Sequence, residues 1–197
     1  MENLIDRVKN IIVTPKTEWL KIDAENSPHV KVCTTYVALL ALIPAVASLI
    51  GYWLIGSHGV HIFKWGLYHA VLQYLLMVGG TYVTAYVIDA LAPNYGAQKS
   101  LDKAYSLVAY AYTPTMVGGI FYLIPALSSL ASIAALYSLY LLYIGLQPMM
   151  KQPADKTTSY FVVSLLVFLV AFVVVSLVLG AILGLLLIGS ASAYSFF

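Results

Sequence analysis

The sequence predicts an all-α polytopic membrane protein, a five-transmembrane-helix bundle with a short N-terminal amphipathic interfacial helix. Two observations support this fold class. The chain is 61% hydrophobic and 9% charged, whereas about 25% of the residues in soluble globular proteins are charged. In addition, nine of its ten Lys and Arg residues fall on one side of the membrane when the apolar runs are taken as spans. Basic loops stay cytoplasmic, so the same pattern predicts the orientation.

The apolar runs set the number of spans. A hydrocarbon core about 30 Å thick needs about 20 apolar residues per helix. Three runs meet this length directly, and the stretch from Ala104 to Gln147 is long enough for two helices. Pro125 divides that stretch, because proline interrupts the helical hydrogen-bond ladder. Charge does not distinguish two full crossings from a re-entrant hairpin there, and length favours the crossings. The predicted spans, within one domain of residues 1–197, are 30–55, 65–91, 104–124, 127–147 and 160–188.

The segment 1–29 precedes the first span and has a helical pattern of its own. Its apolar residues recur at i, i+4, i+7 and i+8, which predicts a short helix in the cytoplasmic interface with its apolar side towards lipid. Thr14-Pro15 fits an N-cap followed by proline, so a second short helix carrying Trp19 is expected. Five spans then make the N-terminus cytoplasmic and the C-terminus extracytoplasmic. The apolar stripe consists of Leu4, Val8, Ile11 and Ile12.

Asp89 is the only acidic residue well inside a predicted span. A charged group at the bilayer centre costs about 2.5–3.5 kcal/mol on insertion scales, which makes it a candidate functional residue. Tyr82, Tyr86 and Asp89 follow an i, i+4, i+7 spacing and are expected on one helix face. The structural alternative is a carboxylate that is paired with Lys99 or Lys103, or hydrogen-bonded to a Tyr, and holds two helices in register. The complete candidate polar cluster is Asp89, Tyr82, Tyr86, Tyr110, Tyr112 and Pro114.

Small residues recur every four positions in the fifth predicted span. Ser176, Gly180 and Gly184 form this stripe and include a Gly-x-x-x-Gly motif. Small residues let the backbones of membrane helices approach closely. The stripe therefore fits either packing within the chain or the seam of a homo-oligomer.

Several function classes are disfavoured by what the sequence lacks. The single Cys33 rules out an intrachain disulfide and a multi-cysteine metal site. No P-loop, G-x-S-x-G or H-E-x-x-H motif occurs. A net charge of +2, with the bases spread along the chain, argues against nucleic-acid binding. We therefore expect no enzyme, no metal and no cofactor.

Four stretches resemble the bacterial-type branch of the Yip family of integral membrane proteins, named for eukaryotic relatives that interact with Ypt/Rab GTPases. The resemblance implies a five-helix membrane bundle with a cytosolic N-terminus and carries over no catalytic residues. Eukaryotic members are linked to vesicle traffic between the endoplasmic reticulum and the Golgi. The stretches are Leu4–Trp19, Ile88–Pro93, Ala109–Pro114 and Leu141–Leu146.

Two functional hypotheses follow. The first is a membrane organiser or adaptor that contacts the lipid bilayer, a membrane or peripheral protein, or a second copy of the chain at the cytoplasmic leaflet. The second is a small channel or transporter with a cavity near Asp89 and the Tyr-rich faces. Convergence of Asp89, Tyr82, Tyr110 and Pro114 on one accessible cavity would favour transport.

Overall fold

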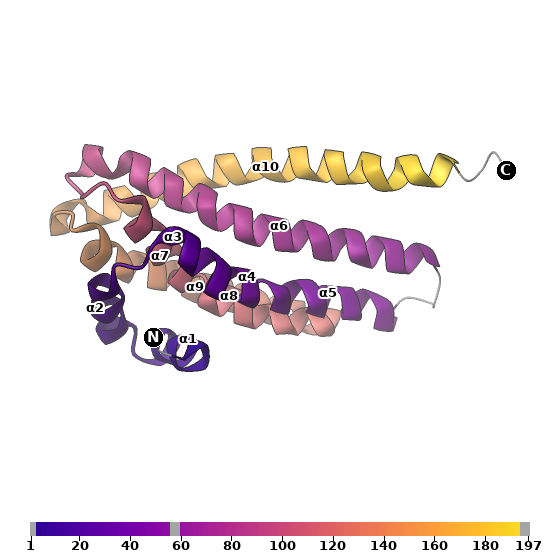
Figure 1. Ribbon diagram of the computed structural model, residues 1–197, viewed down its shortest axis with the longest axis horizontal. Helices are drawn as coiled ribbons and strands as arrows, with labels where there is room; N and C mark the ends of the chain where they lie inside the picture. The colour runs from indigo at the N-terminus through magenta and orange to yellow at the C-terminus, as the bar shows by residue number, and fades with distance from the viewer. Residues whose placement is uncertain (1–2, 56–59, 194–197) are drawn as a thin grey trace.

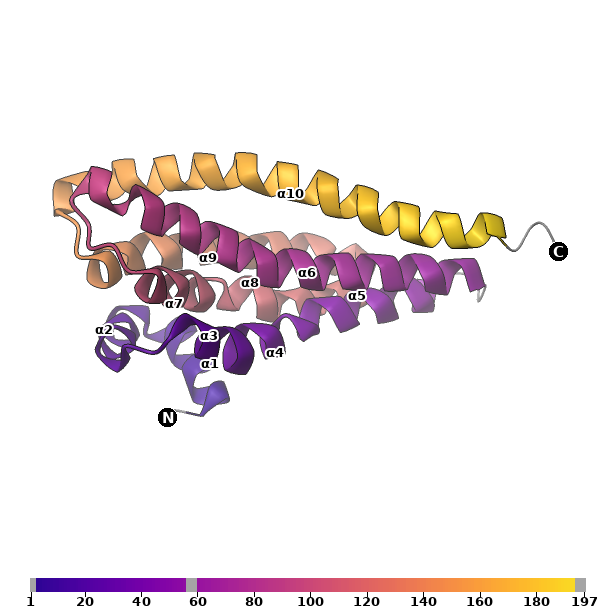
Figure 2. The same cartoon turned by 45° about the horizontal axis from the view of Figure 1, so that its top comes forward.

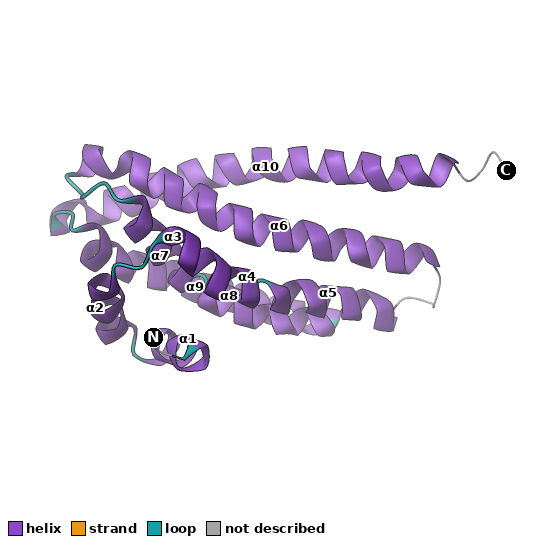
Figure 3. Cartoon of the chain, viewed as in Figure 1, coloured by secondary structure: helices purple, strands orange, loops and turns teal. Residues whose placement is uncertain are grey.

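The protein is a helical bundle, described by a computed structural model over residues 3–55 and 60–193. Every regular element in those two ranges is a helix (Figure 3). The long helices run side by side along the long axis of the molecule (Figure 1). Four helical stretches within the described ranges are long and apolar enough to cross a membrane. The predicted all-α membrane fold is thereby confirmed at this level; the C-terminal residues 194–197 lie outside the described ranges.

The first of these stretches, His29–Trp53, is a rod of several helical pieces. A π-helical turn and a break at Ala41 interrupt its regular hydrogen bonding. The residue range nevertheless agrees with the predicted span 30–55. Its pieces are α3 (His29–Val32), the π-helical turn Cys33–Val37, α4 (Ala38–Leu40) and α5 (Leu42–Ile55).

The other three membrane-length stretches are single long helices. Two short 3₁₀ turns, Ala92–Tyr95 and Ala154–Lys156, lie in the connections at the Lys-rich end. Each long helix includes most of the corresponding predicted span, so the length of the apolar run was a sound guide. The helices are α6 (Val60–Leu91), α9 (Ser128–Met150) and α10 (Thr157–Ala193).

The predicted span 104–124 is broken rather than continuous. Its helix stops at Ala111, and a new one starts at Thr113 with Pro114 in its first turn. None of the pieces alone has membrane-spanning length, so the five-span count is not established by helix length. The pieces are α7 (Leu101–Ala111), α8 (Thr113–Gly118) and the 3₁₀ turns Gly119–Leu123 and Pro125–Leu127, the last at the turn predicted from Pro125.

Close helix contacts hold the broken segment in place. A Cβ atom at Gly118 would lie 2.5 Å from the Cβ of Ala134 in α9. One at Gly119 would lie 2.4 Å from the Cβ of Pro44 in α5. Both distances are too short for real atoms, so only glycine permits this approach. The segment is thus wedged between α5 and α9.

The bundle is unevenly packed. Residues Ala104 to Ala111 of α7 are all buried, and the main core surrounds them. At the opposite extreme, only 6% of the apolar window of α10 is buried. This helix lies at the edge of the molecule, against α6 and the near end of α9 (Figure 2). The tight core therefore sits at the Lys-rich end.

Candidate functional site: a docked N-terminal cap

The first two helices form a cap that lies against α7, α8 and α9 (Figure 1). They are α1 (Leu4–Val13) and α2 (Pro15–Glu25), and we call them the cap. The helices occur where the sequence predicts them, but the predicted apolar stripe does not face lipid. Ile11 is fully buried, and Leu4, Val8 and Ile12 pack against the core. The stripe is matched to the protein itself, which corrects the expectation of a lipid-facing side.

Trp19 anchors α2. Its side chain is 1% exposed. The indole lies on Gly145 of α9, where a Cβ atom would come within 2.5 Å of Trp19 Cε2 and 2.7 Å of Leu107 Cδ1. Gly145 therefore creates the seat for the ring. Leu4–Trp19 and Leu141–Leu146, two of the stretches that carry the resemblance, meet at this contact.

A buried guanidinium ties the two cap helices together. Arg7 is 5% exposed, and its Nη1 donates to Glu18 Oε1 at 2.5 Å. Its Nη2 donates to Glu25, and its Cζ lies 5.5 Å from the centre of the Tyr110 ring. Burial lowers the pKa of Arg7, but the hydrogen bond and charge of Glu25 outweigh it, so the pKa of Arg7 is raised above its ordinary value. The cation–π contact adds attraction towards α7.

Asp23 joins the cap to two other elements. One carboxylate oxygen accepts from Lys103 Nζ at 2.8 Å, and the other accepts from Lys151 Nζ at 2.5 Å. Lys151 directly follows α9 and has a left-handed backbone with φ of 56°. Partial burial would raise the pKa of Asp23, but the two ammonium groups lower it below 3.8. The cap is thus bound to α7 and to the end of α9 by charge.

A second charged contact lies at the start of the first span. The backbone N–H of His29 donates to Asp102 Oδ1 at 2.7 Å, and its ring Nδ1 lies 2.6 Å from the same oxygen. These hydrogen bonds lower the pKa of Asp102 below 3.8. His29 thus fixes the beginning of α3 to the first turn of α7.

The structure separates two members of the predicted polar cluster. Asp89 is 8% exposed, and its Oδ1 is buried with no hydrogen-bond partner among the described residues. Lys103, one of its suggested partners, binds Asp23 instead. Tyr86 is 67% exposed and so turns away from the buried carboxylate. Tyr82 packs its ring 4.5 Å from that of Tyr105.

The remaining members border three different cavities. Tyr110 lines a cavity of 200 Å³ beside Arg7. Tyr112 lines one of 590 Å³, and its hydroxyl is 3.1 Å from Thr84 Oγ1. Pro114 lines one of 380 Å³. Neither Asp89 nor Tyr82 borders any of these three, so the candidate residues do not converge on one of them.

The small-residue stripe of α10 has a partner within the chain. The hydroxyl of Tyr68 in α6 donates to the carbonyl of Gly180 at 3.2 Å. Ser176 has a buried hydroxyl, while a Cβ at Gly184 would meet nothing within 4 Å. At Gly180 the stripe therefore faces α6 of the same chain.

Sequence reasoning missed the ionic contacts of the cap. A signal was present, because five of the eight acidic residues fall within the first 25 positions. This concentration of acids indicates ion pairs in the cap. The signal does not name those partners, since Lys103 and Lys151 are 80 and 128 residues away from Asp23.

The comparisons agree with this membrane fold. The family model described as the Yip1 domain matches residues 9–177. The inner membrane protein YohC of Escherichia coli K12 is 32% identical over 117 residues, which cover 56% of this chain and 60% of YohC. YohC of E. coli O6:H1 strain CFT073 gives the same values.

The chain thus spans about 60% of the length of the curated relatives it matches. Among solved structures, none matches. The match to the family model covers far more than half of the chain and includes the cap from Lys9 onwards, α6, α9 and α10 as far as Leu177. This integral membrane protein belongs to the Yip1 domain family.

Proposed function

We propose that the protein is a non-enzymatic membrane organiser or adaptor that binds a partner protein through its cap at the cytoplasmic leaflet. The proposal includes five crossings, with α7 and α8 stacked end to end as the third. The nine-to-one distribution of Lys and Arg supports a cytoplasmic cap. Maleimide labelling of a cysteine placed at Ile124 tests the crossing. A full crossing would be labelled from the side opposite Lys151, whereas a re-entrant hairpin would be labelled from the side of Lys151.

One observation carries the adaptor function: the cap is firmly docked and yet presents large apolar side chains. Ile5, Val13 and Leu20 are 70%, 67% and 63% exposed. Their helices are held by buried ion pairs and by Trp19, so the exposed side chains have a fixed arrangement. Exposed apolar groups outside a membrane span mark interaction surfaces. A pre-organised surface of this kind loses little entropy when a partner binds.

Site-specific photo-crosslinking tests the adaptor function. A photoreactive amino acid at Val13, in the full chain and in native membranes, should give a discrete crosslinked product. Leu20→Asp should abolish that product. Thr17→Asp, which changes an exposed polar position on the same helix, should leave it intact. A product that survives Leu20→Asp, or no product at all, would contradict the proposal.

Asp89 supports a second candidate function, a small channel or transporter. A buried carboxylate oxygen without a hydrogen-bond partner in the described chain is costly and is suited to binding a proton or cation. Flux of protons and monovalent cations into liposomes should then fall to background in Asp89→Asn. Equal background flux in wild type and Asp89→Asn would eliminate this candidate without affecting the adaptor proposal.

A further inference from the structure

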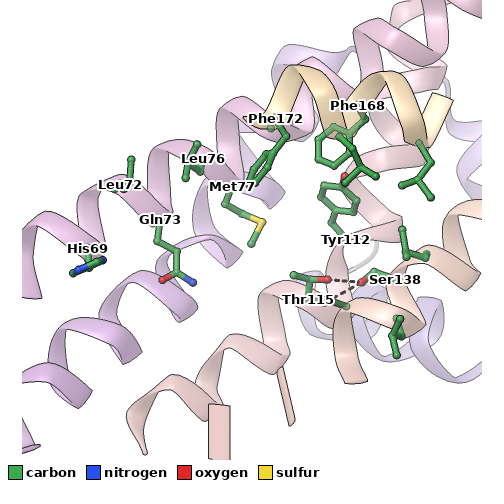
Figure 4. Close-up of a pocket in the computed structure, with 16 residues that line it drawn as sticks. His69, Leu72, Gln73, Leu76, Met77, Tyr112, Thr115, Ser138, Phe168 and Phe172 are labelled. Carbon is green, nitrogen blue, oxygen red and sulfur yellow. Dashed lines mark hydrogen bonds between the residues drawn. The ribbon is translucent and has the colours of Figure 1, made fainter. Parts of the chain in front are cut away.

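A large apolar groove lies among α6, α8, α9 and α10, away from the cap. Its volume is 590 Å³. Figure 4 shows His69 and Gln73 at one end and Tyr112, Thr115 and Ser138 at the other, with Met77 and Phe172 between them. The polar groups at the second end are already paired, because Thr115 Oγ1 donates to Ser138 Oγ at 2.8 Å. The middle of the groove is therefore apolar.

The length of the groove corresponds to one leaflet. On α6 its lining extends from His69 to Gly80, and eleven residues of helix rise about 16 Å. The hydrocarbon core of a bilayer is about 30 Å thick, so half of it is about 15 Å. His69 lies near the end of α6 that is opposite the Lys-rich end. The groove thus runs from that surface to about the middle of the membrane.

The groove is open sideways to the bilayer. Leu136 of α9 and Leu169 of α10 line it and are 65% and 47% exposed, so they form its rim. The hydrocarbon region of a bilayer contains no water that could fill the groove. Protein interiors also leave few empty voids larger than a water molecule. A space of this size inside the membrane is therefore filled by something other than water.

The size and polarity of the groove distinguish between two possible occupants, a partner helix and a hydrocarbon chain. A partner helix is about 10 Å across and is a broad occupant for a groove of 590 Å³. A single hydrocarbon chain is much thinner. Gln73 also points into the groove and makes no hydrogen bond to any described residue. An amide in that position suits a ligand with a hydrogen-bond acceptor at one end.

We propose that the groove binds one acyl chain of a membrane lipid. The ester end lies towards His69 and Gln73, and the methyl end lies towards Tyr112 and Phe168. The lipid enters between Leu136 and Leu169 from the leaflet opposite the Lys-rich end. The proposal is independent of the adaptor function, because it uses no residue of the cap.

Two adjacent glycines provide a matched test. Gly80 lines the groove, and a Cβ there would be 4.0 Å from the Phe172 ring. Gly79 does not line it, and a Cβ there would meet nothing within 4 Å. Gly80→Leu therefore fills the groove, whereas Gly79→Leu adds the same side chain outside it. Both variants keep the rest of α6 unchanged.

The experiment uses the full chain in vesicles of phosphatidylethanolamine and phosphatidylglycerol that contain a phosphatidylcholine with a diazirine on one acyl chain. After irradiation, labelled residues are mapped by peptide mass spectrometry. Met77 and Phe172 should be labelled in wild type and in Gly79→Leu. In Gly80→Leu their labelling should fall about tenfold, equivalent to about 1.4 kcal/mol. Labelling of Val174, on the exposed side of α10, should not change.

Rim variants guard against misfolding of Gly80→Leu. Leu169→Trp narrows the entrance at an exposed position and should lower the labelling of Met77. Leu177→Trp, at a position 69% exposed and away from the groove, should not. Equal labelling of Met77 in wild type, Gly80→Leu and Leu169→Trp would overturn the proposal. So would labelling in the groove no stronger than at Val174.

Discussion

Gly145→Ala should release the cap from the bundle. The added Cβ would come within 2.5 Å of Trp19 Cε2 and 2.7 Å of Leu107 Cδ1. Trp19 is 1% exposed, so its ring has no free space into which to retreat. The indole must therefore shift, and α2 must shift with it. The added methyl group is small, but its effect extends over the whole cap.

The expected cost follows from the packing. Overfilling a close-packed site costs about 1–3 kcal/mol, which corresponds to a change of about 5- to 150-fold in the equilibrium between docked and undocked cap. Replacing glycine by alanine also favours the helix itself by about 1 kcal/mol. Gly79→Ala shares that gain, and its Cβ meets nothing within 4 Å. The difference between the two variants therefore isolates the contact with Trp19.

Hydrogen exchange measures this equilibrium directly. In lipid nanodiscs, amides of residues 4–25 should exchange about 5- to 150-fold faster in Gly145→Ala than in Gly79→Ala. In a Trp19→Ala background the same substitution should have a much smaller effect, because the main clash is gone. Unchanged exchange in Gly145→Ala, or equal acceleration in both alanine variants, would refute the reasoning.

Three further predictions concern the contacts of the cap. Arg7→Gln should loosen α1 from α2 by at most about 3–5 kcal/mol, because the fully buried Glu18 loses its guanidinium and keeps the ion pair with Lys21 at 3.2 Å. Glu18→Gln in the same chain should restore part of the hydrogen-exchange protection. Because the pKa of Asp23 is lowered in the folded protein, its ion pairs stabilise the docked cap above pH 3.8, and this stabilisation is lost as the pH falls through the folded-state pKa. In Asp23→Asn, hydrogen exchange of the cap measured between pH 5 and pH 3 should therefore depend less on pH. Tyr137→Phe removes a 2.7 Å hydrogen bond to the Ile12 carbonyl, and the end of α1 should lose about 1 kcal/mol of protection.

The long helices could be predicted from the sequence because their cause is local. An apolar run of about 20 residues must satisfy its backbone hydrogen bonds internally when it lies in lipid, which requires a helix. Pro125 marks a break for an equally local reason, since proline interrupts the hydrogen-bond ladder, and the structure places a turn there. The break at Thr113, before Pro114, was not predicted, because proline also lies within helices, as Pro148 does in α9.

The docking of the cap could not be predicted in the same way. An apolar stripe such as that of Ile11 has the same spacing whether it faces lipid or protein, because lipid tails are as apolar as core side chains. Similarly, Tyr86 lies about 60° around the helix from Asp89 at 100° per residue. That angle allows one side chain to be exposed and the other buried. Helical spacing defines a face but does not identify what the face contacts.

The two ends of the bundle are held together by different forces, and α8 and α9 are the elements they share. Helices in lipid gain no hydrophobic energy from association, so specific contacts decide where packing is tight. At the cap, Gly145 and buried ion pairs supply them; near the groove, the hydrogen bond from Tyr68 to Gly180 joins α10 to α6. Ser138 lines the groove only seven residues, or about 10 Å, from Gly145. Coupling between cap and groove can therefore pass along α8 or α9, and it must be reciprocal: if undocking of the cap in Gly145→Ala alters lipid labelling, then loss of lipid from the groove in Gly80→Leu should alter exchange in the cap.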